Sequence, residues 1–193
     1  MEEKILSEKE SLELISKMIQ RSQQKSRKNN GRTFLIFGYT SIIVSLTIYF
    51  LHMISTSKLI GLAWLGIPII GFALSYLTKR KDDQYSKTII GSMVNKVWTV
   101  IAVAIYGVSF TPFLFPYPVL PTIILLLGIG TAITGLIVKS NSVTAGGIIG
   151  MILSIVLYGF QDYTQVAVFA ICIFIMQVIP GHILQYKSNT KNV

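Results

Sequence analysis

Residues 97–138 read VWTVIAVAIYGVSFTPFLFPYPVLPTIILLLGIGTAITGLIV, a run that contains no Asp, Glu, Lys or Arg. An apolar helix needs about 20 residues to cross a bilayer, so this run is long enough for two crossings. Prolines at positions 112, 116, 118 and 121 interrupt its middle. Because proline lacks the amide donor and disfavours helix in the residue before it, the run predicts two membrane helices joined by a non-helical connection.

Four other stretches also lack acidic and basic residues, and each is about the length of one crossing: 33–57, 59–78, 140–161 and 163–186. Together the stretches predict an all-α polytopic membrane bundle of six transmembrane helices in three hairpins, at about 33–54, 59–78, 93–111, 119–138, 143–160 and 164–186. Only 13% of the 193 residues are charged, about half the fraction of an ordinary soluble domain. The composition therefore disfavours a soluble enzyme, a disordered chain and a disulfide scaffold.

The positions of Lys and Arg predict the orientation, because positive residues near span ends stay on the cytoplasmic side. With the N-terminus inside, sixteen of the 17 Lys and Arg residues are cytoplasmic, and only Lys58 faces outward. We therefore expect a multi-pass protein of the bacterial cytoplasmic (inner) membrane with both termini in the cytoplasm. The net charge of +9 is explained by this topology and by attraction to anionic inner-leaflet lipids, so no nucleic-acid partner is predicted.

This topology divides the chain into a cytoplasmic segment 1–32, a six-helix transmembrane domain 33–186 and a cytoplasmic tail 187–193. The first 32 residues are hydrophilic, so no cleavable signal peptide is expected and the first span acts as an anchor. Within this segment, Ser7 and Glu10 have the spacing of a capping box, which predicts an amphipathic helix over about 8–26. Asn29-Asn30-Gly31 predicts a break between this helix and the first span.

The predicted N-terminal helix carries an apolar stripe, since at 100° per residue four large side chains share one side with Leu14: Leu12, Ile15, Met18 and Ile19. Glu13 and Lys17 on the other side form an i,i+4 pair. Such a stripe needs a cover, and three covers remain open. They are the protein's own cytoplasmic loops, the lipid interface, and a partner helix from this chain, a second copy or another protein.

Four short motifs run through the chain: LELISKMI at 12–19, Phe37-Gly38-Tyr39, TGLIVK at 134–139, and Ile179-Pro180-Gly181-His182. In these motifs the chain resembles an uncharacterised family of small six-span bacterial membrane proteins with a cytoplasmic amphipathic N-terminal helix and a terminal Ile-Pro-Gly motif. His182 stands where that family has an aromatic residue. The resemblance covers nearly the whole chain and implies the six-span architecture, but the family has no assigned activity to transfer.

The ends of the second, fourth and sixth spans are similar to one another, and the triplet Lys139-Ser140-Asn141 recurs at 187–189. This similarity is the basis of a hypothesis that three hairpins form a parallel repeat. Small residues spaced by four let helices approach closely, and two such pairs are candidates for helix packing: Gly128 with Ala132, and Gly146 with Gly150. Their spacing leaves open whether the contact is within one chain or between chains.

Polar side chains within spans are rare, because an ionised group in hydrocarbon is costly without a partner or water. The predicted spans hold no Asp or Glu, and the candidate intramembrane polar site consists of Asn95, Lys96, Gln177 and His182. Pro180-Gly181 before His182 predicts a bend that frees a backbone carbonyl near the inner leaflet. Cys172 is the only cysteine, and no metal-ligand cluster, nucleophile with a base or paired carboxylates is present. We therefore expect no catalysis, no metal and no cofactor.

These observations predict a non-enzymatic membrane protein, an anchoring, sensory or regulatory module that acts through its N-terminal helix on a cytoplasmic protein, a second copy or anionic lipid. The alternative is a small-solute transporter or channel subunit. Pro68 and Pro180 inside spans favour this alternative, because broken helices expose backbone to a substrate. A wet cavity lined by Asn95, Gln177 and His182 is expected of a carrier, whereas a dry bundle is expected of an anchoring module.

Overall fold

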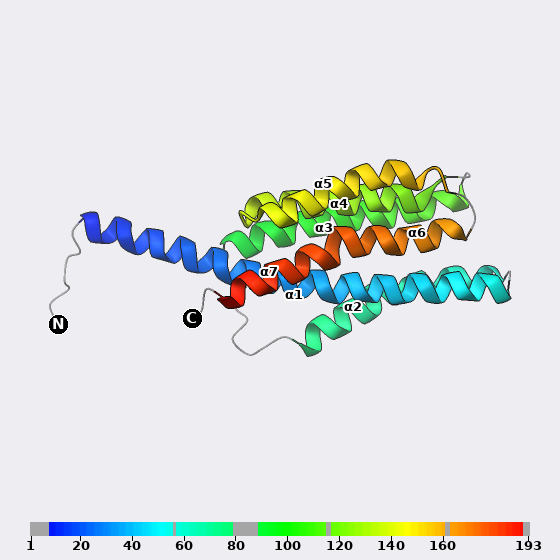
Figure 1. Ribbon diagram of the computed structural model, residues 1–193, viewed down its shortest axis with the longest axis horizontal. Helices are drawn as coiled ribbons and strands as arrows, with labels where there is room; N and C mark the ends of the chain where they lie inside the picture. Colours follow the sequence, from blue (N-terminus) through cyan, green and yellow to red (C-terminus); the bar gives the residue numbers. More distant parts are fainter. Residues whose placement is uncertain (1–7, 56, 79–88, 115–116, 161–162, 191–193) are drawn as a thin grey trace.

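The computed structural model describes residues 8–55, 57–78, 89–114, 117–160 and 163–190, and in these ranges the chain forms helices joined by turns (Figure 1). Two segments are 3₁₀-helical, η1 and η3, and the segment η4 is a π-helix. The elements in chain order are α1 (Glu8–Ile54), η1 (Lys58–Leu65), α2 (Gly66–Leu77), α3 (Ile89–Phe110), η3 (Thr111–Phe113), α4 (Val119–Ile137), α5 (Asn141–Leu157), α6 (Thr164–Ile173), η4 (Phe174–Val178) and α7 (Ile179–Thr190).

Within the described ranges, five helical segments are long and apolar enough to cross a membrane: Lys28–Ile54, Leu59–Leu77, Ile89–Phe110, Val119–Ile137 and Thr164–Lys187. The remaining apolar helix, α5, has 17 residues and is about 26 Å long at 1.5 Å per residue. That length falls short of a hydrocarbon core of about 30 Å. A sixth span therefore stays a prediction, whereas a helical bundle with five span-length apolar helices is observed.

The connection between α3 and α4 is non-α-helical where its prolines predicted it. The α3 helix ends at Phe110, a short 3₁₀ turn covers Thr111–Phe113, and α4 begins at Val119. The Tyr117 hydroxyl lies 2.9 Å from the Thr122 hydroxyl and ties the connection to the first turn of α4. Residues 115–116 lie outside the described ranges.

The predicted break at Asn29-Asn30-Gly31 is wrong, because α1 is one continuous helix over Glu8–Ile54. Asn30 is 5% exposed, and a Cβ added at Gly31 would lie 3.3 Å from both the Gly181 carbonyl oxygen and the Gln185 amide nitrogen of α7. The glycine therefore serves a close helix–helix approach instead of a chain reversal. The proposed capping box begins at Ser7, which lies outside the described residues.

The helices pack in an order that differs from their order in the chain (Figure 1). The α1 helix contacts α2 on one side and the α6–η4–α7 segment on another, so the first and last spans are neighbours. The α5 helix packs between η4–α7 and α4, and α3 lies mainly on α4. The closest pair is α4 with α5, which belong to different predicted hairpins.

Three buried clusters hold this arrangement together. The largest joins Ile124 of α4 and Leu157 of α5 to four residues of α6 and η4: Phe169, Cys172, Ile173 and Met176. A second joins α1, η1 and α6 around Ile48. The third lies at the start of the packed part of α1, next to the arm, where Phe34 meets Val143, Leu184 and the Trp98 ring. The core therefore follows α1 from one end of the bundle to the other.

The turn between α4 and α5 is a Schellman motif, in which two amides bond back to the carbonyls of the last helical turn. The Ser140 amide donates to the Gly135 carbonyl at 2.8 Å, and the Lys139 amide donates to the Leu136 carbonyl at 3.2 Å. Lys139 has a φ of 53°, a left-handed conformation that favours glycine. Lys187, its counterpart in the proposed repeat, lies inside α7, so the two matching triplets differ in local structure.

Replacing Lys139 by glycine is therefore expected to stabilise the protein by about 1 kcal/mol, because glycine removes the cost of left-handed backbone for a side chain. The measurement is the unfolding midpoint in detergent. Lys139→Ala is the matched control, since it removes the same charge but keeps a Cβ, and it should give no gain. Equal stability of the glycine and alanine variants would show that this backbone conformation is wrong.

Candidate functional site

The first part of α1 is an arm, residues 8–28, that extends beyond the bundle along the helix axis (Figure 1). At 1.5 Å per residue the arm is about 30 Å long. Leu12 and Met18 are 68% and 62% exposed, and Leu14, Ile15 and Ile19 are each at least half exposed. These five side chains meet no buried cluster of the bundle within the described residues. The described residues therefore leave the stripe uncovered.

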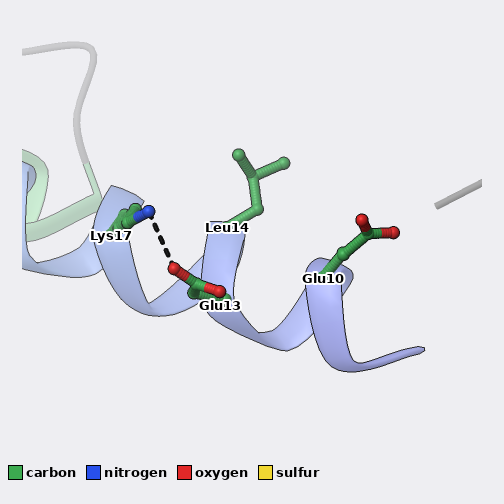
Figure 2. Close-up of a pocket in the computed structure, with 4 residues that line it drawn as sticks. All are labelled: Glu10, Glu13, Leu14 and Lys17. Carbon is green, nitrogen blue, oxygen red and sulfur yellow. Dashed lines mark ion pairs between the residues drawn. The ribbon is translucent and has the colours of Figure 1, made fainter. Parts of the chain in front are cut away.

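The polar side of the arm contains the predicted ion pair. The Lys17 ammonium nitrogen lies 2.8 Å from the Glu13 carboxylate, one helical turn away. Figure 2 shows these two side chains together with Leu14 and Glu10, which line a surface depression on the arm. Exposed pairs of this kind contribute about 0.3–0.5 kcal/mol to helix stability. We therefore assign the pair to stabilisation of the arm and not to a binding site.

The direction of the arm is fixed by the contact between α1 and α7. Gly31 and the buried Asn30 hold the start of the packed part of α1 close to Gly181 and Gln185. Farther along, a Cβ added at Gly38 would lie 2.8 Å from a methyl carbon of Val178. Because the helix continues through this contact, the arm follows the axis of the span and cannot lie flat on the bilayer without a bend.

The structure places the four candidate packing residues in contacts within one chain. Gly128 and Ala132 of α4 face α5, where a Cβ added at Gly147 would lie 2.7 Å from the Ala132 Cα atom and the Gly128 carbonyl oxygen. Gly146 and Gly150 face the other neighbour of α5, since Cβ atoms added there would collide with Pro180 and Met176. Two glycine faces thus let α5 approach two helices closely.

Gln177 is the most buried member of the candidate polar site, at 4% exposed. It lies in the π-helical turn η4, where the Ile179 amide donates to the Phe174 carbonyl. Pro180 has no amide to give to the Met176 carbonyl, and a π turn is a common accommodation of such a defect in a helix. The Gln177 carboxamide oxygen packs toward Gly38 of α1. The Met176 carbonyl faces Gly146 of α5, so the carbonyl freed by Pro180 points into a helix contact.

His182 is exposed on α7, and its Nε2 atom lies 2.8 Å from the Tyr39 hydroxyl of α1. The two rings meet edge to face with centroids 6.0 Å apart. Tyr39 is 43% exposed, so this hydrogen bond lies on the outside of the bundle. The pair ties α1 to α7 beside the glycine contact and does not line an interior cavity.

Asn95 and Lys96 are exposed on α3. One turn along, the Trp98 indole donates to the Thr134 hydroxyl of α4 at 3.1 Å. Because a short connection joins α3 to α4, the two helices run in opposite directions, and Asn95 lies near the level of the last turn of α4. The Asn95 and Lys96 side chains therefore lie in the first part of α3. The structure does not gather the four candidate polar residues into one site.

The described ranges contain no group of three His, Cys, Asp or Glu side chains that could hold a metal ion. Cys172 is buried in the largest core cluster, where it acts as a small packing residue. Among the described residues, the Thr131 and Ser75 hydroxyl oxygens are buried without a hydrogen-bond partner. The described residues therefore offer polar groups that position helices and apolar side chains that are exposed on the arm.

Sequence reasoning missed three residues that shape these contacts. Gly147 carries the closest approach of α4 and α5, and the only signal for it was the Gly146-Gly147 doublet. Tyr39 bonds His182 across 143 positions of sequence, which no local pattern indicates. Asn30 is buried inside α1, one residue before the Gly31 contact with α7, although Asn and Gly together are typical of helix ends.

Comparison with known protein families, with curated proteins and with solved structures finds no match. The class of the protein therefore follows from its own helices. Within the described residues it is an all-helical protein with five helices long and apolar enough to span a membrane, and with an extended helical arm that exposes an apolar stripe.

Proposed function

We propose that this chain is a non-enzymatic integral protein of the bacterial cytoplasmic membrane that anchors a docking helix, the arm of α1, and engages a partner through its apolar stripe. The observation that carries the proposal is the exposure of Leu12, Ile15, Met18 and Ile19 on a helix rigidly continuous with a span. Large apolar side chains grouped on one exposed face mark interaction sites. An anchoring, sensory or regulatory module uses such a face to recruit or report on its partner.

The proposed topology has six spans in three hairpins, with both termini cytoplasmic. Lys139 and Lys187 support it, since Lys139 lies in the turn just before Val143 of α5 and Lys187 lies one turn after Leu184 of α7, and both Val143 and Leu184 belong to the Phe34 cluster. This end of the bundle is the one from which the arm extends (Figure 1). The positive-inside rule places that end in the cytoplasm, so the stripe faces cytoplasmic partners.

Replacing Ile15 and Ile19 by glutamate is expected to lower the affinity for the partner at least about tenfold, because two charges on the stripe must be desolvated on docking. The measurement is co-purification from membranes solubilised in mild detergent, compared with the unaltered chain. Insertion should be unchanged, because both residues lie outside every span-length apolar segment.

The matched control is Gln20→Glu with Gln24→Glu, which adds the same charges at the same i,i+4 spacing to the exposed opposite side of the arm. This variant should retain the partner. Equal loss in both variants would show that net charge, and not the stripe, controls binding. Retention of the partner by Ile15→Glu with Ile19→Glu would contradict the proposed function.

A second candidate function is a small-solute transporter or channel subunit, and the observation that favours it is the discontinuous last span. Gln177 lies buried in the π turn that precedes Pro180, and broken helices near the middle of a membrane often form substrate sites. For a carrier, Gln177→Leu should abolish solute uptake into vesicles while the arm variants leave uptake intact. For an anchoring module, Gln177→Leu should leave partner binding intact while the arm variant Ile15→Glu with Ile19→Glu removes it.

A further inference from the structure

The exposed face of α1 does not stop at the arm. Counted in heptads from Leu12, the a positions are 12, 19, 26, 33, 40, 47 and 54, and the d positions are 15, 22, 29, 36, 43 and 50. We call the residues at these positions the α1 seam. The seam begins with the apolar stripe of the arm and continues through the whole span to the last residue of the helix.

Most of the α1 seam is accessible on both parts of the helix. In the arm, Leu12, Ile15 and Ile19 are more than half exposed, and in the span Ile43, Phe50 and Ile54 are 64%, 58% and 84% exposed. Thr33 and Thr47 at a positions are also exposed, and Thr40 is the seam residue that is buried. The exposed seam residues therefore form two patches on one continuous helix of 47 residues, one in the arm and one in the second half of the span, with Thr33 exposed between them.

A seam with a period of 3.5 residues drifts by about 20° per heptad on a straight helix, so two helices that share it wind around each other with a left-handed twist. Lipid alone requires only an apolar surface and no particular period. The span part of the α1 seam also carries Thr33 and Thr47, whose hydroxyls bond the carbonyls of Asn29 and Ile43 at 3.0 and 2.9 Å. Small hydroxyl residues of this kind are enriched where membrane helices meet.

The charges of the arm are placed away from the α1 seam. Glu13 and Lys17, which pair with each other, occupy b and f positions on the far side. In the arm, the g and e positions that face each other in a parallel pair combine Ser11 with Ser16 and Met18 with Gln23. Neither combination brings two like charges together, so a parallel pair meets no electrostatic penalty at its flanks.

From these observations we infer that the partner of the stripe is the α1 helix of a second copy, packed in parallel along the α1 seam from the arm through the membrane. Two copies inserted in the same orientation place their arms side by side and pointing the same way, which is the geometry that a parallel pair needs. This inference rests on the proposed function, since it names the partner of the same stripe. Confinement in one membrane raises the effective concentration of the second helix.

Disulfide cross-linking in native membranes tests the inference. In a Cys172→Ser background, Ser22→Cys in the arm and Thr47→Cys in the span place one thiol at a seam position. Gln24→Cys in the arm and Val103→Cys on the exposed side of α3 are the off-seam controls. With a copper–phenanthroline oxidant, the two seam variants should form disulfide-linked dimers at least about tenfold faster than the controls, because a and d residues of parallel helices face each other.

Phe50→Cys is a second span variant, at a d position, which keeps the test decisive if Thr47→Cys fails to fold. Rapid cross-linking in the arm without cross-linking at either span position would overturn the continuous seam. Cross-linking at neither end would overturn pairing of copies altogether. If no cross-linking occurs but Ile15→Glu with Ile19→Glu still loses its partner, the proposed function stands and only the pairing of copies is wrong. If the partner is also retained by this variant, both the pairing and the proposed function are wrong.

Discussion

Gly147→Leu is expected to abolish the folded, monodisperse protein in detergent, because α4 and α5 leave no room for a side chain at this position. A Cβ added at Gly147 would lie 2.7 Å from both the Ala132 Cα atom and the Gly128 carbonyl oxygen, and closer still to the Ala132 amide. These are backbone atoms that no rotamer change can move. Overpacking usually costs 1–3 kcal/mol, and here we expect about 3 kcal/mol or more, since two helices must separate.

The control is Gly107→Leu in α3, where an added Cβ meets nothing within 4 Å. Both changes replace a helical glycine by leucine, and the higher helix propensity of leucine favours the helix by about 1 kcal/mol in each case. The control should therefore elute and melt like the unaltered chain or slightly above it. A Gly147→Leu protein that also melts normally would show that α4 and α5 do not form the close contact described above.

The second large effect concerns orientation, and it follows from the distribution of Lys and Arg. Single cysteines at Ser26, Ser86, Asn141 and Ser188, each in a Cys172→Ser background, should resist a membrane-impermeant thiol reagent in intact cells. Each should react fully after lysis, because all four lie in proposed cytoplasmic segments. Ser57→Cys is the positive control for the outside.

The position at Asn141 is the most informative of the four, because it is the first residue of the short helix α5, just after the turn from α4. Protection at Asn141 together with protection at Ser188 requires α5 and the α6–α7 segment to cross the membrane as a pair, which supports a sixth span. Labelling at Asn141 in intact cells at the rate seen at Ser57 would contradict the six-span topology. Ser86 lies outside the described residues, so its labelling adds independent information.

Span positions could be predicted from sequence because length and the absence of charge are local properties. Three of the helices end at Ile54, Phe110 and Ile137, within one residue of the expected ends, whereas α5 ends at Leu157, three residues early, and α7 continues to Thr190. The predicted break at Asn29–Gly31 was wrong because the role of this glycine is not a local property. Whether a glycine ends a helix or lets another helix approach depends on α7, about 150 residues away, and the local pattern is the same in both cases.

The candidate sites were predictable only in part. Small-residue spacing identified Gly128, Ala132, Gly146 and Gly150 as packing positions, but spacing does not state which helix each glycine faces. The polar residues were grouped because they share a chemical character, yet Asn95 lies exposed on α3 while Gln177 is buried beside α1. The π turn before Pro180 also depends on how a whole span accommodates one missing amide.

The contact between α1 and α7 also dictates when the protein can finish assembling during synthesis. The polar and glycine-rich face of α1 leaves the ribosome first, but the helix that covers it leaves last, since Tyr39 must wait for His182, 143 positions later. The α4–α5 pair, joined by a short turn, can form as soon as both helices are inserted. Until translation ends, Gly31, Gly38 and Tyr39 of α1 therefore lack their contacts with η4 and α7, and an incomplete chain displays this face to lipid and to quality-control proteases.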